Sequence, residues 1–260
     1  MEGKEGTLMP YKNGRPLVDD SIFFRIASFI TFQFVWILAK PVLLLMYKTR
    51  IFGRKKIRKC KTGVIISNHT TFFDPVTISC LVRPRRMFHT LLEETVEAPF
   101  LGTLTRLLGG IPVPTKGKKP MEELISACRI AVKRRNFVHF YPEGECFLYN
   151  QNVQPFQAGA FYIAARLNNP VIPVAVVMKP GLFRPYSILG RSRPREEVYV
   201  LDAVYPAEFG CIDLEGNINI KKVKELSVYV RNKIQDEIIL RKGTNIFYKG
   251  KMERIKGVNS

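Results

Sequence analysis

The sequence contains three histidines, and one of them has a carboxylate at a spacing that suits acid–base chemistry. His89 and His139 lie within apolar runs typical of strands, which predicts two buried core histidines. His69 follows the apolar run 63–67 and precedes Asp74 by five residues. If the chain turns between them, the carboxylate can hold one ring nitrogen and leave the other as a proton acceptor. The alternative interpretation is that Asp74 only caps a helix and His69 is a polar turn residue.

The elements that must position this pair are predicted by the surrounding residues. The run 63–67 suits a buried strand, and Asp74 followed by Pro75 is typical of a helix start with Asp74 as the N-cap. A strand–turn–helix lets the two side chains face each other, whereas a continuous helix would hold them about 140° apart. Loops at the carboxyl ends of strands are also where α/β sheets bind ligands. The pair needs no serine or cysteine nucleophile if the substrate supplies its own hydroxyl group.

The remaining chain alternates between strand-like and helix-like segments. This alternation predicts an α/β fold with a mixed, largely parallel sheet flanked by helices. The expected strands cover residues 87–91, 111–113, 137–141, 171–177 and 198–204, and the expected helices cover about 99–108, 120–132, 159–167 and 221–240.

Composition and charge narrow the class of protein further. A chain of 260 residues can bury a sizeable core, and 46% hydrophobic against 24% charged residues excludes a disordered chain. The 41 Lys and Arg against 22 Asp and Glu give a net charge of +19, which implies an anionic partner surface. The five scattered cysteines show neither a disulfide framework nor zinc spacing, which predicts a reducing, cytosol-facing compartment.

The first part of the chain carries an apolar segment followed by a basic one. Residues 22–48 are apolar, and residues 50–61 hold the largest basic cluster. The charge-free run 26–39 would be about 21 Å long as a helix, which is short for a hydrocarbon core of roughly 30 Å. We therefore expect two short helices, bent near Pro41, that dip into one leaflet of an anionic membrane. A buried core helix pair and a true membrane span are the alternatives.

This interpretation divides the chain into a membrane-associating segment, residues 1–61, and an enzyme-like domain, residues 62–260, with its motifs within 63–177. Nucleic acid is not an expected partner, because the basic cluster adjoins an aromatic segment and no nucleic-acid-binding motif is recognisable. The expected membrane-inserted surface consists of Phe23, Phe24, Phe29, Phe32, Phe34 and Trp36.

Four short blocks occur in order between residues 68 and 174. They are Asn68-His69-Thr70-Thr71-Phe72-Phe73-Asp74, Gly109-Gly110-Ile111-Pro112-Val113, Tyr141-Pro142-Glu143-Gly144 and Val171-Ile172-Pro173-Val174. They resemble, in the same order, the N-H-x4-D, G-x-I-x-V, F-P-E-G-T-R-S and V-I-P-V motifs of the glycerolipid acyltransferase family. The best-known members of that family are 1-acylglycerol-3-phosphate (lysophosphatidic acid) acyltransferases.

The resemblance implies acyl transfer without a covalent acyl-enzyme, in agreement with the absence of a G-x-S-x-G motif. His69, oriented by Asp74, would remove the proton from an acceptor hydroxyl as its oxygen attacks an acyl thioester. The donor would be acyl-CoA or acyl-carrier protein, and neither a metal nor a bound organic cofactor is expected. The expected substrate-binding residues are Asn68, Lys116, Glu143 and Gly144.

Three positions where the family carries basic residues are neutral in this chain. The second-block arginine corresponds to Thr115, although Lys116 follows it, the third-block arginine to Cys146, and a downstream lysine to Gln157. Because paired cationic contacts recognise a phosphate monoester, these changes leave the acceptor open. Lysophosphatidic acid is the first candidate, and another lysophospholipid, a lyso-aminolipid or a glycolipid is the alternative. A catalytically inactive protein that binds anionic membranes also stays open.

Overall fold

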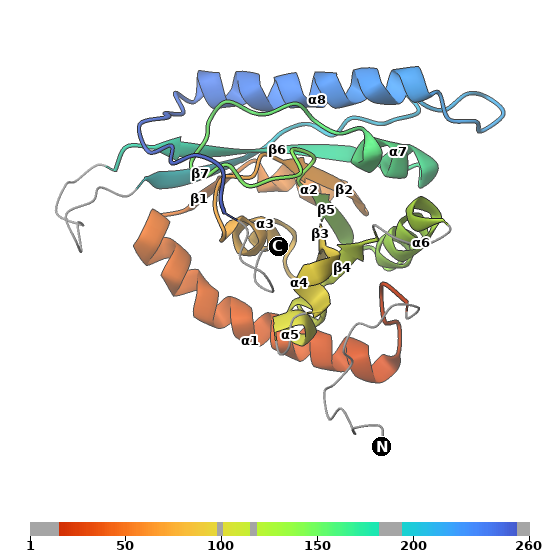
Figure 1. Ribbon diagram of the computed structural model, residues 1–260, viewed down its shortest axis with the longest axis horizontal. Helices are drawn as coiled ribbons and strands as arrows, with labels where there is room; N and C mark the ends of the chain where they lie inside the picture. The colour runs from red at the N-terminus through yellow and green to blue at the C-terminus, as the bar shows by residue number, and fades with distance from the viewer. Residues whose placement is uncertain (1–15, 98–100, 115–118, 182–193, 254–260) are drawn as a thin grey trace.

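The computed structural model describes residues 16–97, 101–114, 119–181 and 194–253. These residues form a seven-stranded sheet in the order β1-β7-β6-β2-β5-β3-β4 (Figure 1). Neighbouring strands are parallel except β6 and β7, so the predicted mixed, largely parallel sheet is confirmed. The strands are β1 (Arg50–Phe52), β2 (Gly63–Ser67), β3 (Met87–Leu92), β4 (Gly110–Val113), β5 (Phe137–Phe140), β6 (Val171–Lys179) and β7 (Arg195–Val200).

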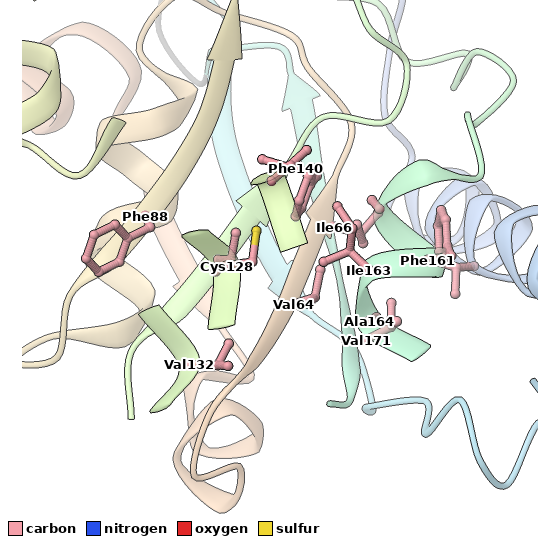
Figure 2. Close-up of a cluster of buried hydrophobic side chains, with 14 of the residues drawn as sticks. Val64, Ile66, Phe88, Cys128, Val132, Phe140, Phe161, Ile163, Ala164 and Val171 are labelled. Carbon is pink, nitrogen blue, oxygen red and sulfur yellow. The ribbon is translucent and has the colours of Figure 1, made fainter. Parts of the chain in front are cut away.

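Helices cover both faces of the sheet. The helices α6 (Pro120–Lys133), α7 (Gly159–Arg166) and α8 (Ile220–Leu240) pack on one face, and α2 (Arg54–Lys59) and α3 (Asp74–Val82) pack on the other. An apolar core lies on each face. Along β2, Val64 and Ile66 lie in the core under α6, α7 and α8, with Cys128 of α6 and Phe161 of α7 (Figure 2), whereas Ile65 lies in the core under α2 and α3. A strand that is buried on both faces is apolar along its whole length, which is why apolar and polar residues do not alternate in β2.

The predicted elements occur with shifted ends. The strand expected at 198–204 begins earlier and ends at Val200, after which Val204 makes only an isolated bridge to Val171. The helix expected at about 99–108 is described as α5 (Leu101–Leu107), which follows a separate short helix, α4 (Glu93–Glu97).

The N-terminal apolar segment forms one helix, α1 (Ile22–Tyr47), and the expectation of two short helices is wrong. Pro41 lies inside α1, although an interior proline removes one backbone hydrogen bond and costs about 3 kcal/mol. Leu43 and Tyr47 after the proline are buried, as are Phe24 and Phe32 before it. Burial on both sides of Pro41 stabilises the continuous helix, which follows a curved path past α3 and α5 in Figure 1.

Only part of the expected aromatic surface of α1 is exposed. Phe24 and Phe32 face the domain, and the indole ring of Trp36 is covered by Arg83, whose guanidinium carbon lies 3.6 Å from the ring centroid. Among the described helices, α1 is the one that is long and apolar enough to cross a membrane, judged by length and composition. We call its exposed apolar side the outer face of α1; it comprises Ile22, Phe23, Ile26, Phe29, Ile30, Phe34, Ile37, Leu38, Val42, Leu44 and Leu45.

The basic segment that follows α1 packs onto the sheet. β1 pairs with β7, and α2 contacts α3 and β7. Ile57, the one apolar residue of α2, is fully buried among its basic neighbours. The buried Ile57 and the three residues of β1 thus join the basic segment to the sheet, and the division of the chain after residue 61 stays a prediction.

Candidate active site

Two neighbouring parallel strands, β2 and β5, end at the same edge of the sheet and carry the candidate site. The loop 68–73 follows β2 and leads into α3, and residues 141–144 follow β5. Ile66 and Phe140 are partners in the β2–β5 register, so the two loops begin side by side. This is the carboxyl edge of the parallel strands, where α/β sheets bind ligands.

Asp74 organises the loop after β2. Its buried carboxylate accepts hydrogen bonds from the backbone N–H groups of Thr70 at 2.6 Å and Thr71 at 2.9 Å, and from the Thr71 hydroxyl at 2.7 Å. Phe73, not Asp74, occupies the N-cap position of α3, so the predicted N-cap is wrong by one residue. The physical reason is that the Asp74 carboxylate accepts hydrogen bonds from Thr70 and Thr71 in the preceding loop instead of from the first turn of α3.

The same carboxylate holds His69. Asp74 Oδ2 lies 2.9 Å from His69 Nδ1, as the predicted pairing requires. In the neutral ring, Nδ1–H donates to Asp74 and the lone pair of Nε2 is left as an acceptor. The His69 side chain is 18% exposed, and Nε2 has no hydrogen-bond partner among the described residues. The geometry thus presents one basic nitrogen at the surface of an otherwise buried pair.

Tyr141 is a site residue that the sequence analysis did not single out. Its ring stacks on the His69 ring, with centroids 3.8 Å apart and planes 13° from parallel, and it meets the His139 ring edge-on at 4.3 Å. Burial and the carboxylate of Asp74 raise the pKa of Tyr141, so its hydroxyl stays protonated. Contact with Asp74 on one atom and Tyr141 on one face fixes the orientation of His69. The signal in the sequence was the position of Tyr141 directly after β5, at the start of the third block.

Glu143 supports the loop that carries His69, and Gly144 belongs to the turn that positions Glu143. The two carboxylate oxygens of Glu143 accept from the backbone N–H groups of His69 at 2.9 Å and Gln154 at 3.1 Å, and burial raises its pKa to about 7. Gly144 has φ +74°, and a Cβ there would lie 2.8 Å from Nε2 of Gln157. The structure therefore gives both residues a positioning role, and their predicted contact with substrate stays a prediction.

Of the other two predicted substrate-binding residues, Asn68 lies inside the protein and Lys116 lies outside the described residues. The Asn68 amide is buried and bonds to both backbone groups of Val176, at 2.9 Å and 2.8 Å, which ties the end of β2 to β6. With its oxygen and nitrogen both engaged inside the protein, Asn68 is placed as a positioning residue rather than as a direct contact. Lys116, like Thr115, lies outside the described residues.

The prediction that His89 and His139 are core histidines is confirmed. Both are buried, with Nε2 of His89 2.8 Å from the Ser79 hydroxyl and Nε2 of His139 2.9 Å from the Ser67 hydroxyl. Their Nδ1 atoms lie 3.1 Å apart, so one ring donates to the other. Burial lowers the pKa of His89 to about 3 and the pKa of His139 well below its ordinary value, which keeps both rings neutral.

Another buried carboxyl group, Glu196 on β7, is bonded to α3, the helix that begins at Asp74. Its Oε2 accepts from the hydroxyls of Thr49 at 2.7 Å and Thr77 at 3.2 Å, which joins β7 to the end of α1 and to α3. Burial, and then the carboxylate of Asp74, raise the pKa of Glu196 to about 8. The sequence showed no sign of this residue, because β7 is distant from His69 along the chain.

Glu196 is expected to make the folded protein less stable as the pH rises. Between its ordinary pKa of 4.5 and about 8, the folded state keeps a proton that the unfolded chain has released. The free energy of unfolding therefore falls across this window, by up to about 1.4 kcal/mol per pH unit for one such group. Glu196→Gln should flatten this slope in urea titrations at several pH values. The exposed residue Glu208 offers the control Glu208→Gln, and equal slopes in the two variants would contradict the expectation.

The fold and the site geometry together define a class of protein. The model of the acyltransferase family matches residues 48–177, half of the chain, and this range includes the His69–Asp74 pair. The chain belongs to this family. The resemblance to the glycerolipid acyltransferase family is therefore confirmed, in agreement with the names of the curated relatives.

The curated relatives are similar over their central parts. The chain is 28% identical over 132 residues to the chloroplastic 1-acyl-sn-glycerol-3-phosphate acyltransferase BAT2 of Brassica napus, covering 50% of this chain and 38% of that protein. It is 30% identical over 119 residues to the 1-acyl-sn-glycerol-3-phosphate acyltransferase of Escherichia coli, covering 44% of this chain and 46% of that protein. The chain thus spans less than half the length of these two relatives.

Among solved structures, the 1-acyl-sn-glycerophosphate (LPA) acyltransferase PlsC from Thermotoga maritima is similar, with a TM-score of 0.57. The likeness covers 85% of this chain and 88% of that chain at 18% sequence identity. At this identity the likeness shows a shared fold and no more.

Proposed function

We propose that the protein is a membrane-associated O-acyltransferase that moves a fatty acyl group from a thioester donor to the hydroxyl group of a lysolipid in phospholipid biosynthesis. The donor is acyl-CoA or acyl-carrier protein, and the first candidate acceptor is 1-acylglycerol-3-phosphate. One observation carries the proposal: His69 is held by Asp74 at 2.9 Å and stacked on Tyr141, with Nε2 left as an acceptor. The names of the curated relatives support the choice of acceptor.

The proposed reaction is a direct transfer. His69 Nε2 takes the proton of the acceptor hydroxyl while that oxygen bonds to the thioester carbonyl carbon. The carbon–sulfur bond then breaks, and the departing thiolate receives the proton from His69. Asp74 holds the ring tautomer and stabilises the imidazolium that forms between these two steps. The proposed reaction uses the thioester as a co-substrate and requires neither a metal nor a bound organic cofactor.

The state of Cys146 supports direct transfer over an acyl-enzyme. Cys146 is the cysteine of the third block, next to the site, and its side chain is buried. Burial raises the pKa of its thiol, and the carboxylate of Asp74 adds to the effect. A protonated, buried thiol is a poor nucleophile, because the thiolate is the reactive form.

Membrane binding through the outer face of α1 is part of the proposal, with the protein on the cytosolic side. The other side of α1 packs against α5 and α3, and the Ser28 hydroxyl donates to the Leu107 carbonyl. A helix packed on the domain along one side lies on a membrane more readily than it crosses one, since crossing would surround it with lipid. The five free cysteines fit a reducing, cytosol-facing compartment.

The triple variant Phe23→Ser, Phe34→Ser and Leu45→Ser should lose most of its binding to anionic vesicles, because it removes three exposed apolar side chains from the outer face. Vesicle flotation measures the bound fraction. The matched control replaces three exposed apolar residues elsewhere by serine, Leu214, Ile239 and Ile246, and should float like the parent protein. If both triple variants lost vesicle binding equally, or if neither lost it, binding through the outer face of α1 would be contradicted.

Acyl transfer by the purified protein tests the proposed function. Labelled acyl-CoA and acyl-carrier protein are each offered with lysophosphatidic acid, and then with other lysolipids, in anionic vesicles. Transfer to lysophosphatidic acid supports the whole proposal, and transfer only to acceptors without a phosphate monoester keeps the mechanism and changes the acceptor. No transfer to any acceptor, with vesicle binding intact, would favour a catalytically inactive membrane-binding protein.

A further inference from the structure

We propose that Lys251 supplies the cationic contact for the phosphate group of the acceptor, at the place where the third block carries Cys146 instead of an arginine. The inference rests on the proposed function, since it concerns the acceptor of the same reaction. It assigns a specificity-determining role to a residue far along the chain from all four blocks.

The C-terminal segment, residues 245–252, is paired with the third-block loop. The Leu148 N–H donates to the Gly250 carbonyl at 2.9 Å, and the Met252 N–H donates to the Cys146 carbonyl at 2.8 Å. Between these bonds, Phe147 and Lys251 form an antiparallel bridge. Lys251 is therefore the direct neighbour of the residue that follows Cys146.

The third-block loop is in turn paired with the loop that carries His69. The Phe147 N–H donates to the His69 carbonyl at 3.1 Å, and the Tyr149 N–H donates to the Thr70 carbonyl at 2.8 Å. Three chain segments thus lie side by side, with the third-block loop between the His69 loop and the C-terminal segment. Adjacent segments in such pairing are about 4.8 Å apart, which puts the Lys251 backbone roughly 10 Å from that of His69. A flexible lysine side chain spans part of that distance.

The charge of Lys251 is available for an anionic ligand. Its side chain is 52% exposed, and its ammonium group pairs with Glu145 at 3.0 Å. A partly exposed pair of this kind contributes little stability, so another anion can replace Glu145 as the partner of Lys251. A phosphate monoester offers more negative charge and more acceptor oxygens than one carboxylate, so it competes well for the lysine. Glu145 holds the ammonium group near the third block until the phosphate arrives.

Neighbouring residues do not offer the same contact. Cys146 is buried, and its raised pKa keeps the thiol uncharged. Lys249, also on the C-terminal segment, places its ammonium group 5.8 Å from the centroid of the Tyr149 ring. Gln157 carries no charge. Of these, Lys251 is the residue whose position and charge fit the missing arginine.

Opposite effects of two substitutions test the inference. Lys251→Ala should raise the KM for lysophosphatidic acid at least about tenfold, since hydrogen bonds to charged groups are strong, and should leave kcat nearly unchanged. Glu145→Gln should lower that KM, because it removes the competing carboxylate. Lys249→Ala is the matched control and should behave as the parent protein. Monoacylglycerol, which has no phosphate, serves as the second acceptor, and its KM should not respond to Lys251→Ala.

Binding of short-chain lysophosphatidic acid, measured by calorimetry, separates this inference from the proposed function. Binding that weakens in Lys251→Ala supports the inference, even if the wild-type protein shows no turnover. Transfer by the wild-type protein with unchanged binding in Lys251→Ala would overturn the inference and leave the function intact. A raised KM for acyl-CoA alone would also overturn it, because the phosphate contacted would then belong to the donor. No binding and no transfer would overturn both.

Discussion

His69→Ala is expected to lower kcat for acyl transfer by roughly 10²- to 10⁴-fold, the range typical of a lost general base. The physical reason is that Nε2 is the basic atom that the site presents, while Nδ1 is held by Asp74 at 2.9 Å. Without the ring, the acceptor hydroxyl must attack the thioester with its proton still attached. Initial rates with saturating thioester and lysolipid measure the effect.

The fold should survive this substitution. Asp74 keeps its bonds from Thr70 and Thr71, so the loop after β2 retains its main supports when the imidazole is removed. Thermal unfolding and vesicle flotation should therefore match the parent protein. Leu214→Ala, at a fully exposed position on the loop before α8, is the control for an alanine substitution as such. An unchanged rate in His69→Ala would rule out the proposed mechanism.

Asp74→Asn is expected to damage both activity and stability, which distinguishes it from His69→Ala. An asparagine has one acceptor oxygen and one NH2 group where the carboxylate accepted from two backbone N–H groups, two threonine hydroxyls and His69. The NH2 group would face other donors, and a buried donor left without a partner costs about 1–3 kcal/mol. We expect the free energy of unfolding to fall by that amount or more and kcat to fall roughly 10²-fold or more, since the ring loses its fixed tautomer.

Urea titrations and initial rates measure the two effects of Asp74→Asn. Asp213→Asn is the matched control, because Asp213 also accepts backbone hydrogen bonds, from Glu215 and Asn217, but lies in an exposed turn. It should leave the rate unchanged and cost little stability. An Asp74→Asn protein with normal stability and a normal rate would mean that the carboxylate charge is not needed to hold His69.

In the proposed function, the acceptor is recognised by a different part of the molecule from the one that carries His69 and Asp74. His69 and Asp74 come from one short loop, whereas the groups that would recognise a phosphate come from the third block and the C-terminal segment. Changes at Cys146 and Gln157 can therefore alter the preferred acceptor while the chemistry stays the same.

Local sequence patterns were sufficient to predict the type of fold and the loop that carries His69 and Asp74. The apolar run of β2, the Asp74-Pro75 start of α3 and the alternation of strands with helices depend on neighbouring residues, and local patterns report such features well. The burial of His89 and His139 followed for the same reason, because each lies within an apolar strand. The ends of the elements could not be predicted in the same way. The single helix α1 could not be predicted either, because burial on both sides of Pro41 is a property of the packed domain.

The distant residues that support and complete the site became visible only in the folded protein. β5 lies beside β2 in the sheet although the two strands are about seventy residues apart along the chain, and that pairing stacks Tyr141 on His69. Glu196 reaches Thr77 from β7, Asn68 bonds to Val176 of β6, and Lys251 pairs with Phe147. No local pattern encodes these contacts, because they depend on strand order and on loop pairing, which arise only when the whole sheet assembles.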